Sequence, residues 1–276
     1  MPVRAPAKLN LCLYLGPLRE DGLHEICSLF EPLTLEDVIR VEPAERDEVI
    51  CPGVDGENLA LAALRELRAA GWGAPPQRIE IEKRIPVAGG LGGGSADAAA
   101  VLRLAAGQVA DLEQLAVRIG ADVPSQLLPS FSLVRGAGEQ VRRLPAPGAH
   151  GIVLLPDPDG LSTAEVYAEA DRLGLGREPA ELDVLAVRLL EPTGAGASPL
   201  SYAELLHNDL EPAALSLRPS IAASKEELYA AGAELAAVTG SGPTVFGLFA
   251  DRAAAVRAAE EIDRAGAIVC EGGPGP

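Results

Sequence analysis

The sequence predicts a mixed fold of β-strands and α-helices in two domains. Strict alternation of apolar and polar side chains over residues 8–15 indicates a β-strand. Five glycines within residues 89–94 form a loop that opens an alanine-rich helix, expected over residues 98–106. A proline- and glycine-rich passage at residues 145–148 precedes a new apolar strand, so we expect domains at residues 1–147 and 148–276.

Composition and charge indicate a folded protein that binds a small ligand. The 276 residues are 48% hydrophobic and 23% charged, which is enough for a sizeable core. The net charge of −17 argues against a nucleic-acid or anionic-membrane partner, so an anionic ligand must be held by local donors. No segment approaches the roughly 20 apolar residues of a membrane span, and we expect no secretory signal.

Cysteine spacing favours a reducing compartment. The four cysteines are scattered, with no Cys-x-x-Cys pair and no histidine cluster nearby: Cys12, Cys27, Cys51 and Cys270. Neither a disulfide framework nor a metal site built from protein ligands is therefore expected. We expect a cytoplasmic protein.

The first strand brings a lysine and an asparagine together. Alternation over residues 8–15 places four leucines on one face, with Lys8 and Asn10 side by side on the other. We therefore expect a strand that is buried on one face only. Lys8 could reach a phosphate or a reacting hydroxyl, and a solvated lysine at a sheet edge is the alternative.

A polar turn follows this strand. It is built on Asp21 and Gly22, and it leads to His24 and to an apolar segment at residues 26–30. His24 could present its ring to a ligand from the end of the turn. A histidine with a purely structural role is the alternative.

The next elements are indicated by alternation and by a helix cap. Looser alternation indicates strands at residues 36–42 and 78–83. Asn58 is expected to cap a helix that stops at Gly71. Pro86 ends the second of these strands just before the glycine loop.

The glycine loop at residues 89–94 is a candidate anion site, because free N–H groups and the positive end of a helix dipole bind phosphate. It is not a P-loop, since Gly94 is followed by Ser95 and Ala96 rather than by lysine. It is not the dinucleotide fingerprint either, since Gly-x-Gly is not completed by a third glycine. A flexible linker is the alternative, but linkers lack the strand before this loop and the apolar helix after it.

Asp122 follows a helix expected at residues 112–119 and stands two residues before Pro124. An aspartate in this position is a good helix N-cap. The functional interpretation is a carboxylate at a junction of loop and helix that accepts a proton from a substrate hydroxyl. The residues alone leave both interpretations open.

The start of the second half is predicted in less detail. A strand is expected at residues 152–155, and Ser162 or Thr163 is expected to cap a helix start. Tyr167 could stack on a flat ring, and an ordinary packed tyrosine is the alternative. Residues 174–201 carry no pattern from which we predict a site.

A second glycine loop occurs near the end of the chain. A capping box at Ser224 and Glu227 predicts a helix that extends to Leu235. The loop at residues 239–243 is expected between this helix and a strand at residues 244–249, so phosphates would be contacted from both domains. The tail, residues 272–276, is expected to fray.

These segments resemble motifs of the GHMP kinases and, within them, of the 4-diphosphocytidyl-2-C-methyl-D-erythritol kinases. The resemblance spans nearly the full chain, in the family's order, through Pro6-Ala-Lys-Leu-Asn-Leu11, Asp21-Gly-Leu-His-Glu25, Pro86 to Ala100, Gly120-Ala-Asp-Val-Pro124, Asn208-Asp-Leu-Glu211 and Gly240-Ser-Gly-Pro-Thr-Val-Phe246. It implies an α+β fold, with an N-terminal domain like the second domain of ribosomal protein S5 and a ferredoxin-like C-terminal domain.

The resemblance also implies an activity: phosphoryl transfer from ATP, with Mg2+, to the 2-hydroxyl of 4-diphosphocytidyl-2-C-methyl-D-erythritol in non-mevalonate isoprenoid biosynthesis. It makes Asp122 the base and Lys8 the residue that orients the hydroxyl. Positions implied near ATP are Asn58, Lys83, Pro86, Val87, Ala88, Gly89, Gly90, Leu91, Gly92, Gly93, Gly94, Ser95 and Ala96. Positions implied near the substrate are Asn10, His24, Tyr167, Gly240 and Ser241, with His24 at the cytosine edge and Tyr167 stacked on the cytosine ring.

The chain departs from the family's pattern in three places. Leu23 stands where a tyrosine usually covers the cytosine, Ala96 replaces a serine, and Ser125-Gln126 replaces an aromatic pair. Three alternatives therefore accompany the main hypothesis: a GHMP kinase for another small alcohol, a catalytically silent nucleotide-binding member, and a phosphate-binding module that is not a kinase. The sequence names no magnesium ligands and no oligomeric state.

Overall fold

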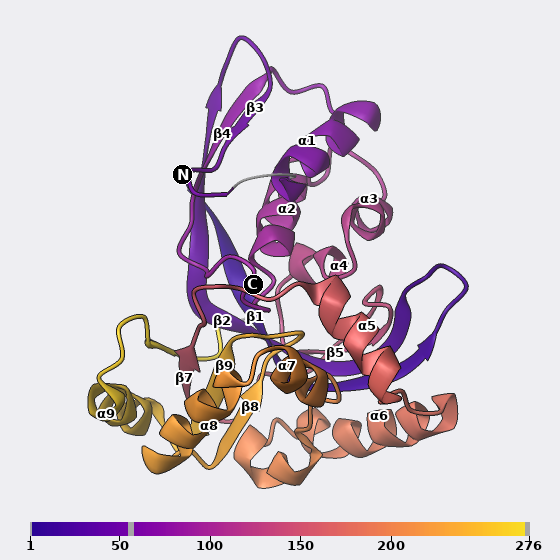
Figure 1. Cartoon of the computed structure of the whole chain (residues 1–276). Coiled ribbons are helices and arrows are strands. Elements are labelled where there is room, and N and C mark those ends of the chain that lie inside the picture. Colours follow the sequence, from indigo (N-terminus) through magenta and orange to yellow (C-terminus); the bar gives the residue numbers. More distant parts are fainter. Residues whose placement is uncertain (1, 55–57, 274–276) are drawn as a thin grey trace.

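The computed structural model describes residues 2–54 and 58–273, and within them the strands form two sheets (Figure 1). The first sheet contains β1 (Val3–Leu18), β2 (His24–Pro43), β3 (Glu48–Ile50), β4 (Gln77–Glu82), β5 (Ser132–Gly136) and β6 (Gln140–Arg143). Its order is β3-β4-β2-β5-β6, with β1 paired to β2. The second sheet has the order β10-β7-β9-β8 and contains β7 (Gly151–Leu155), β8 (Leu235–Val238), β9 (Val245–Phe249) and β10 (Ile268–Cys270).

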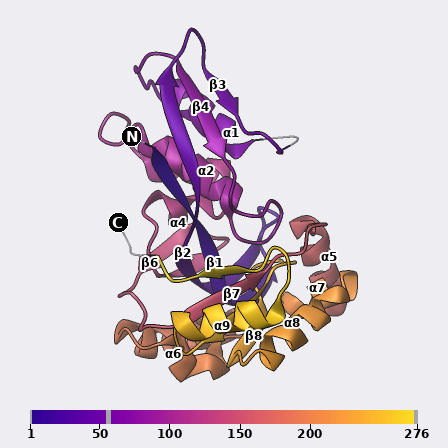
Figure 2. The ribbon, with the colours of Figure 1, turned by 90° about the vertical axis from the view of Figure 1, so that its left-hand side faces the viewer.

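Helices cover parts of both sheets. Those between strands of the first sheet are α1 (Leu59–Ala69), α2 (Gly93–Arg103), α3 (Leu112–Ile119) and α4 (Val123–Leu127). Those that lie between strands of the second sheet along the chain are α5 (Thr163–Leu173), α6 (Pro179–Gly194), the 3-10 segment η1 (Pro199–Leu205), α7 (Glu211–Leu217), α8 (Ser220–Ala230) and α9 (Arg252–Ile262). Figure 2 shows α8 and α9 beside the second sheet, below the lower ends of β1 and β2. The predicted division at residue 147 falls between β6 and β7 and stays a prediction.

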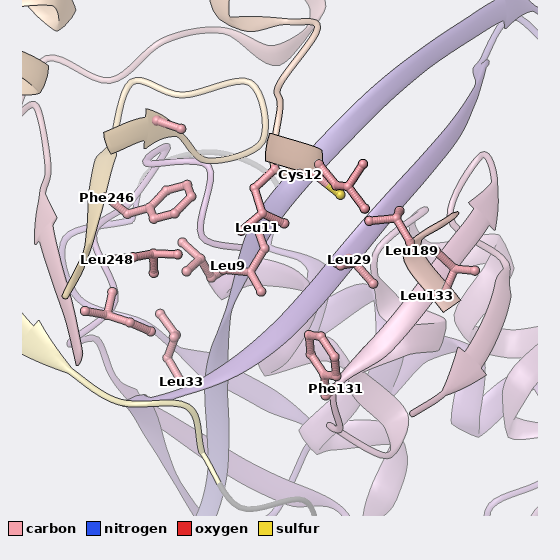
Figure 3. Packing of buried hydrophobic residues seen from close by; sticks show 14 of the residues in the cluster. Leu9, Leu11, Cys12, Leu29, Leu33, Phe131, Leu133, Leu189, Phe246 and Leu248 are labelled. Carbon is pink, nitrogen blue, oxygen red and sulfur yellow. The ribbon is translucent and has the colours of Figure 1, made fainter. Parts of the chain in front are cut away.

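The two sheets pack against each other through apolar side chains. Leu9 and Leu11 of β1 share a core cluster with Phe246 and Leu248 of β9 (Figure 3). The opposite face of the second sheet packs on α8 and α9. The first sheet is in turn covered by α1 and α2 along β2 and β4. Strand β1 therefore lies at the centre of the molecule.

The expectation that β1 is buried on one face only is wrong. Lys8 and Asn10 are buried along with the leucines, because the second sheet and the helices cover both sides of the strand. The four leucines do not share a face either. The pairing of β1 with β2 shifts register between Asn10 and Cys12, and this β-bulge turns Leu13 and Leu15 into a different cluster from Leu9.

The local signals of the first half predict most of its elements. Asn58 caps α1 as expected, since its Oδ1 accepts the Ala60 N–H at 2.9 Å. Helix α2 begins at Gly93 rather than at residue 98, so part of the glycine loop belongs to its first turn. The strand expected at residues 36–42 is part of a longer strand, β2, which also contains the apolar segment 26–30.

The second half contains three corrections. Residues 174–201 include helix α6, which buries Leu182, Ala186 and Leu189 at helical spacing and contains Pro192. Ser224 lies inside α8 and not at its start, and Leu235 begins β8. The second glycine loop consequently joins two strands, β8 and β9, instead of a helix and a strand.

The start of the C-terminal tail is ordered against β2. Gly272 bridges to Leu33, and the Gly273 N–H donates to the Pro32 carbonyl at 2.7 Å, so the expected fraying is wrong for these two residues. Residues 274–276 of that prediction lie outside the described residues. Across the ranges that the structure describes, no helix has the length and apolar character needed to cross a bilayer.

Candidate active site

A cavity of about 940 Å³ opens where the two glycine loops meet the β1–β2 hairpin and α5. Nineteen of the twenty residues predicted for the site line it, from Asn58 and Lys83 at one end to His24 and Tyr167 at the other. Ala96 is the exception, because it is fully buried on the face of α2 that packs on α1 and the sheet. Its place near ATP stays a prediction.

The first glycine loop has a shape that side chains would prevent. Gly90 and Gly92 have φ of 77° and 68°, which favour glycine. A Cβ on Gly90 would lie 2.5 Å from the Thr239 carbonyl oxygen, and a Cβ on Gly92 would lie 2.8 Å from Cγ of Lys8. The loop is thus closely packed between β1 and the second glycine loop. It leads directly into α2, whose free N–H groups and dipole favour an anion.

Lys8 and Asp122 meet beside this loop. The Lys8 Nζ lies 3.3 Å from Oδ2 of Asp122, donates to Asn10 Oδ1, and lies 4.8 Å from the centre of the Phe30 ring. The Lys8 side chain is only 7% exposed, so the alternative of a solvated lysine is wrong. The Asp122 side chain makes no capping hydrogen bond at the start of α4, so its carboxylate is not occupied as a helix cap.

Asn10 and Asn208 fix the second glycine loop against β1. The Asn10 backbone N–H donates to Thr239 Oγ1 at 2.9 Å. Asn208 donates from Nδ2 to the Val238 and Gly240 carbonyls at 2.7 and 2.8 Å. On its other side, this loop reaches α5, where the hydroxyls of Ser241 and Thr163 lie 2.9 Å apart.

The end of the cavity near the hairpin is built around His24. Its Nδ1 donates to the Gly16 carbonyl oxygen at 3.0 Å, and its Nε2 lies 3.2 Å from Oδ1 of Asp171. The Tyr167 ring lies 5.4 Å from the His24 ring, tilted by 41°. Leu23 is 49% exposed on the hairpin and lines the same end. A flat ring could lie here between apolar and aromatic side chains.

The opposite end contains a buried cluster of charges. Lys83 contacts Asp37, and its Nζ lies 2.8 Å from Oδ2 of Asp97. Burial lowers the pKa of Lys83, but the two carboxylates outweigh burial and hold the pKa above its ordinary value. Burial raises the pKa of Asp97 to about 7, although the lysine opposes this shift. Lys83 therefore reaches the cavity as part of a network and not as a free cation.

Sequence reasoning missed Asp97 and Asp171. Asp97 stands alone in the alanine-rich first turns of α2, where a buried aspartate is unusual. Asp171 follows Tyr167 by four positions on α5, so both face the same side of the helix. Within the described ranges, no group of three or more His, Cys, Asp or Glu side chains could hold a metal ion.

The fold and the cavity fit one class of protein, the small-molecule phosphotransferases: an ammonium–carboxylate pair lies beside a glycine loop that opens a helix. Residues 58–129 match the family model of the GHMP kinases N terminal domain, and residues 191–268 match that of the GHMP kinases C terminal. The 4-diphosphocytidyl-2-C-methyl-D-erythritol kinase of Rhodococcus jostii (strain RHA1) is 40% identical over 97% of this chain and 89% of its own. The chain therefore belongs to the GHMP kinase family.

Solved structures agree with this assignment. A crystal structure of 4-(cytidine 5'-diphospho)-2C-methyl-D-erythritol kinase matches with a TM-score of 0.77 and 37% identity, over 99% of this chain and 100% of its own. A homoserine kinase from Cytophaga hutchinsonii matches with a TM-score of 0.71 over 99% of this chain and 95% of its own, but at 18% identity, which shows the fold alone. The predicted α+β GHMP kinase fold is confirmed.

Proposed function

We propose that this protein transfers the γ-phosphoryl group of ATP to the 2-hydroxyl of 4-diphosphocytidyl-2-C-methyl-D-erythritol, a step of the non-mevalonate route to isoprenoids. The observation that carries the proposal is the 3.3 Å contact between Lys8 and Asp122 beside the glycine loop. Relatives and a solved structure that carry the name of this kinase support the choice of substrate. The cavity of about 940 Å³ is near the upper end of the roughly 300–1,000 Å³ of small-molecule sites, which suits two ligands.

The residues divide the work of phosphoryl transfer, which consists mainly of positioning and charge neutralisation. Asp122 accepts the proton of the substrate hydroxyl. The hydroxyl oxygen bonds to the γ-phosphorus, and the bond from this phosphorus to the β–γ bridging oxygen breaks, so that ADP leaves. Lys8 orients the hydroxyl and stabilises the negative charge on the transferred group. Backbone N–H groups at residues 89–95 hold the phosphates at the start of α2.

We assign magnesium to the same centre. Magnesium prefers oxygen ligands and is usually held by one or two carboxylates together with phosphates. Ser95 offers a side-chain oxygen in the cavity beside the glycine loop, and the phosphates of ATP and water would supply the other oxygens to an ion that arrives with ATP. Such an ion would neutralise charge on the phosphates.

We place Asn58 and Lys83 near the adenine, and Asn10, Gly240 and Ser241 near the substrate. His24 and Tyr167 hold the cytosine, with Leu23 as an apolar wall in place of a second ring. Base stacking on an aromatic ring contributes about 1–3 kcal/mol, so this replacement weakens binding without preventing it. Substrates that lack a nucleoside would leave this end of the cavity unfilled.

We place the enzyme in the cytoplasm, with two small-molecule substrates and no nucleic-acid or membrane partner. All four cysteines lie in the described ranges as free thiols, which suits a reducing compartment. The net charge of −17 opposes binding to polyanions.

The test is an assay with purified protein, ATP, Mg2+ and the cytidyl substrate. We expect ADP and a product whose new phosphate is on the 2-oxygen, identified by 31P NMR. Homoserine, mevalonate and a sugar serve as competing acceptors in parallel reactions. Faster turnover of any of these acceptors would favour the second candidate, a kinase for another small alcohol, which the Leu23 departure suggests. Absence of turnover with every acceptor by folded protein would overturn the proposal.

A further inference from the structure

Each of the three aspartates that line the cavity, within the part of the chain that the structure describes, contacts a basic side chain: Asp97 with Lys83, Asp122 with Lys8, and Asp171 with His24. The first two pairs lie at the nucleotide end and at the transfer centre. The third lies at the end assigned above to the substrate's base. Nothing in the proposed reaction yet requires a carboxylate there.

The contacts of His24 determine what this third pair offers to a ligand. The Nδ1 lies 3.0 Å from the Gly16 carbonyl oxygen, which can only accept, so Nδ1 carries a hydrogen. The Nε2 lies 3.2 and 3.4 Å from the two carboxylate oxygens of Asp171, so the ring is held between the Gly16 carbonyl and this carboxylate. The rim of the cavity therefore presents a carboxylate acceptor beside a ring that is fixed in place.

Asp171 has capacity left for a ligand. A carboxylate has about four lone-pair positions, and the contact with one ring nitrogen uses only part of them. The Asp171 side chain is 53% exposed and lines the cavity. It lies on the same face of α5 as Tyr167, whose ring would fix the plane of a stacked base.

A carboxylate acceptor at the edge of the base matches one pyrimidine and opposes the other. Cytosine presents the acceptor N3 beside its 4-amino donor, whereas uracil presents an N3–H donor beside the acceptor O4. Aspartate and glutamate are the side chains that accept a hydrogen bond from the cytosine amino group. A uracil in the same place would set its O4 acceptor against the carboxylate, which costs binding energy.

We propose that Asp171 is a specificity-determining residue, which accepts a hydrogen bond from the 4-amino group of the substrate's cytosine and makes the enzyme prefer cytidyl over uridyl substrates. This inference rests on the proposed function. It assigns to Asp171 the choice of base, and it leaves the transfer chemistry with Lys8 and Asp122.

The test is the variant Asp171→Asn, assayed with the cytidyl substrate and with its uridyl analogue at saturating ATP. An asparagine amide can turn either its oxygen or its NH2 group toward the base, so both pyrimidines find a partner. We expect the preference for cytidyl over uridyl, measured as the ratio of kcat/KM values, to fall by about tenfold or more. The change should appear mainly in KM, with kcat for the cytidyl substrate little affected.

The matched control is Glu165→Gln, which removes one negative charge from an exposed position on the same helix, outside the cavity lining. It should keep the wild-type preference. An unchanged preference in Asp171→Asn, or an equal loss in both variants, would overturn the inference.

Calorimetry separates failure of this inference from failure of the proposed function. CMP and UMP are titrated into wild-type protein and into both variants, with the ATP site filled by a non-hydrolysable analogue. We expect wild-type protein to bind CMP more tightly than UMP and Asp171→Asn to lose this difference. Equal binding of CMP and UMP by wild-type protein overturns the inference. No turnover of the cytidyl substrate by wild-type protein overturns the proposed function instead.

Discussion

The ammonium group of Lys8 and the carboxylate of Asp122 lie 3.3 Å apart, although one belongs to the first strand and the other to the start of α4. The contact forms beside Gly92, where a Cβ would lie within 3.0 Å of the Lys8 side chain. Strand, helix and glycine loop are thus packed together at one point. This arrangement places an ammonium group and a carboxylate beside the loop that we propose holds the phosphates.

Replacement of Lys8 by methionine should remove turnover and spare ATP binding. Methionine keeps much of the buried volume but has no charge to stabilise the transferred group. Loss of one such interaction typically lowers kcat by about 100-fold or more. The measurement is kcat together with ATP affinity by calorimetry. A variant that keeps half of the wild-type kcat would show that Lys8 does not act in the reaction.

The positive φ of Gly90 leads to a second prediction. Gly90→Ala should lower the free energy of unfolding by about 3 kcal/mol or more, because it adds backbone strain to a collision with the Thr239 carbonyl oxygen. Gly107 has a φ of 74° with nothing within 4 Å of a Cβ, so Gly107→Ala is the matched control. Gly107→Ala should lower the free energy of unfolding by only about 1–2 kcal/mol, because it adds backbone strain alone. Urea unfolding measures the free energy of both variants, and equal losses would contradict the collision at Gly90.

A half-buried arginine connects the two elements that carry Lys8 and Asp122. Arg103 donates to the Arg4 carbonyl of β1 and to the Gln126 carbonyl of α4, both at 2.6 Å. Arg103→Met would remove both hydrogen bonds between β1 and α4 and should lower the free energy of unfolding by about 2 kcal/mol, measured with urea. Arg118→Met, which removes only an exposed pair with Glu66, should cost at most about 1 kcal/mol. Similar costs for both variants would refute a structural role for the half-buried guanidinium.

A buried histidine predicts a pH dependence of stability. The Nε2 of His150 lies 3.1 Å from Oε2 of Glu31, between the two sheets. Burial lowers the pKa of His150, but Glu31 outweighs burial and raises the pKa above its ordinary value of 6.5. The folded state therefore holds this proton more tightly than the unfolded state. Its stabilising contribution is complete below pH 6.5 and is lost as the pH rises through the folded pKa.

The measurement is urea unfolding of wild-type protein and His150→Gln between about pH 6 and 9. We expect the free energy of unfolding of the wild-type protein to fall more steeply with pH than that of the variant. Parallel curves would mean that the Glu31 contact does not raise the pKa of His150.

Local signals predicted the site better than they predicted its surroundings. The cap at Asn58 and the loop at residues 89–94 depend on nearby backbone and are readable in sequence. The burial of Lys8 depends on packing against a second sheet, whose first strand begins at Gly151, and the residues around Lys8 give no indication of this packing. The bulge between Asn10 and Cys12 likewise depends on pairing with β2.

Two further errors concern helices of the second half, and one concerns a residue of the cavity. Helix α6 was not predicted because prolines stand near both of its ends, although Leu182, Ala186 and Leu189 follow helical spacing. Ser224 and Glu227 imitate a capping box inside a helix that begins at Ser220. Asp171 could have been predicted as a cavity residue, because it follows Tyr167 by four positions on a helix and so faces the same side.

The central claim is that Asp122 takes the proton from the substrate hydroxyl, and the variant Asp122→Asn tests it most directly. Asparagine keeps the size of the side chain and loses the base, so kcat should fall by at least about 100-fold while ATP affinity stays near that of wild-type protein. Asp111→Asn, at the exposed start of α3, is the matched control and should keep full activity. A kcat of Asp122→Asn close to that of wild-type protein would contradict the account.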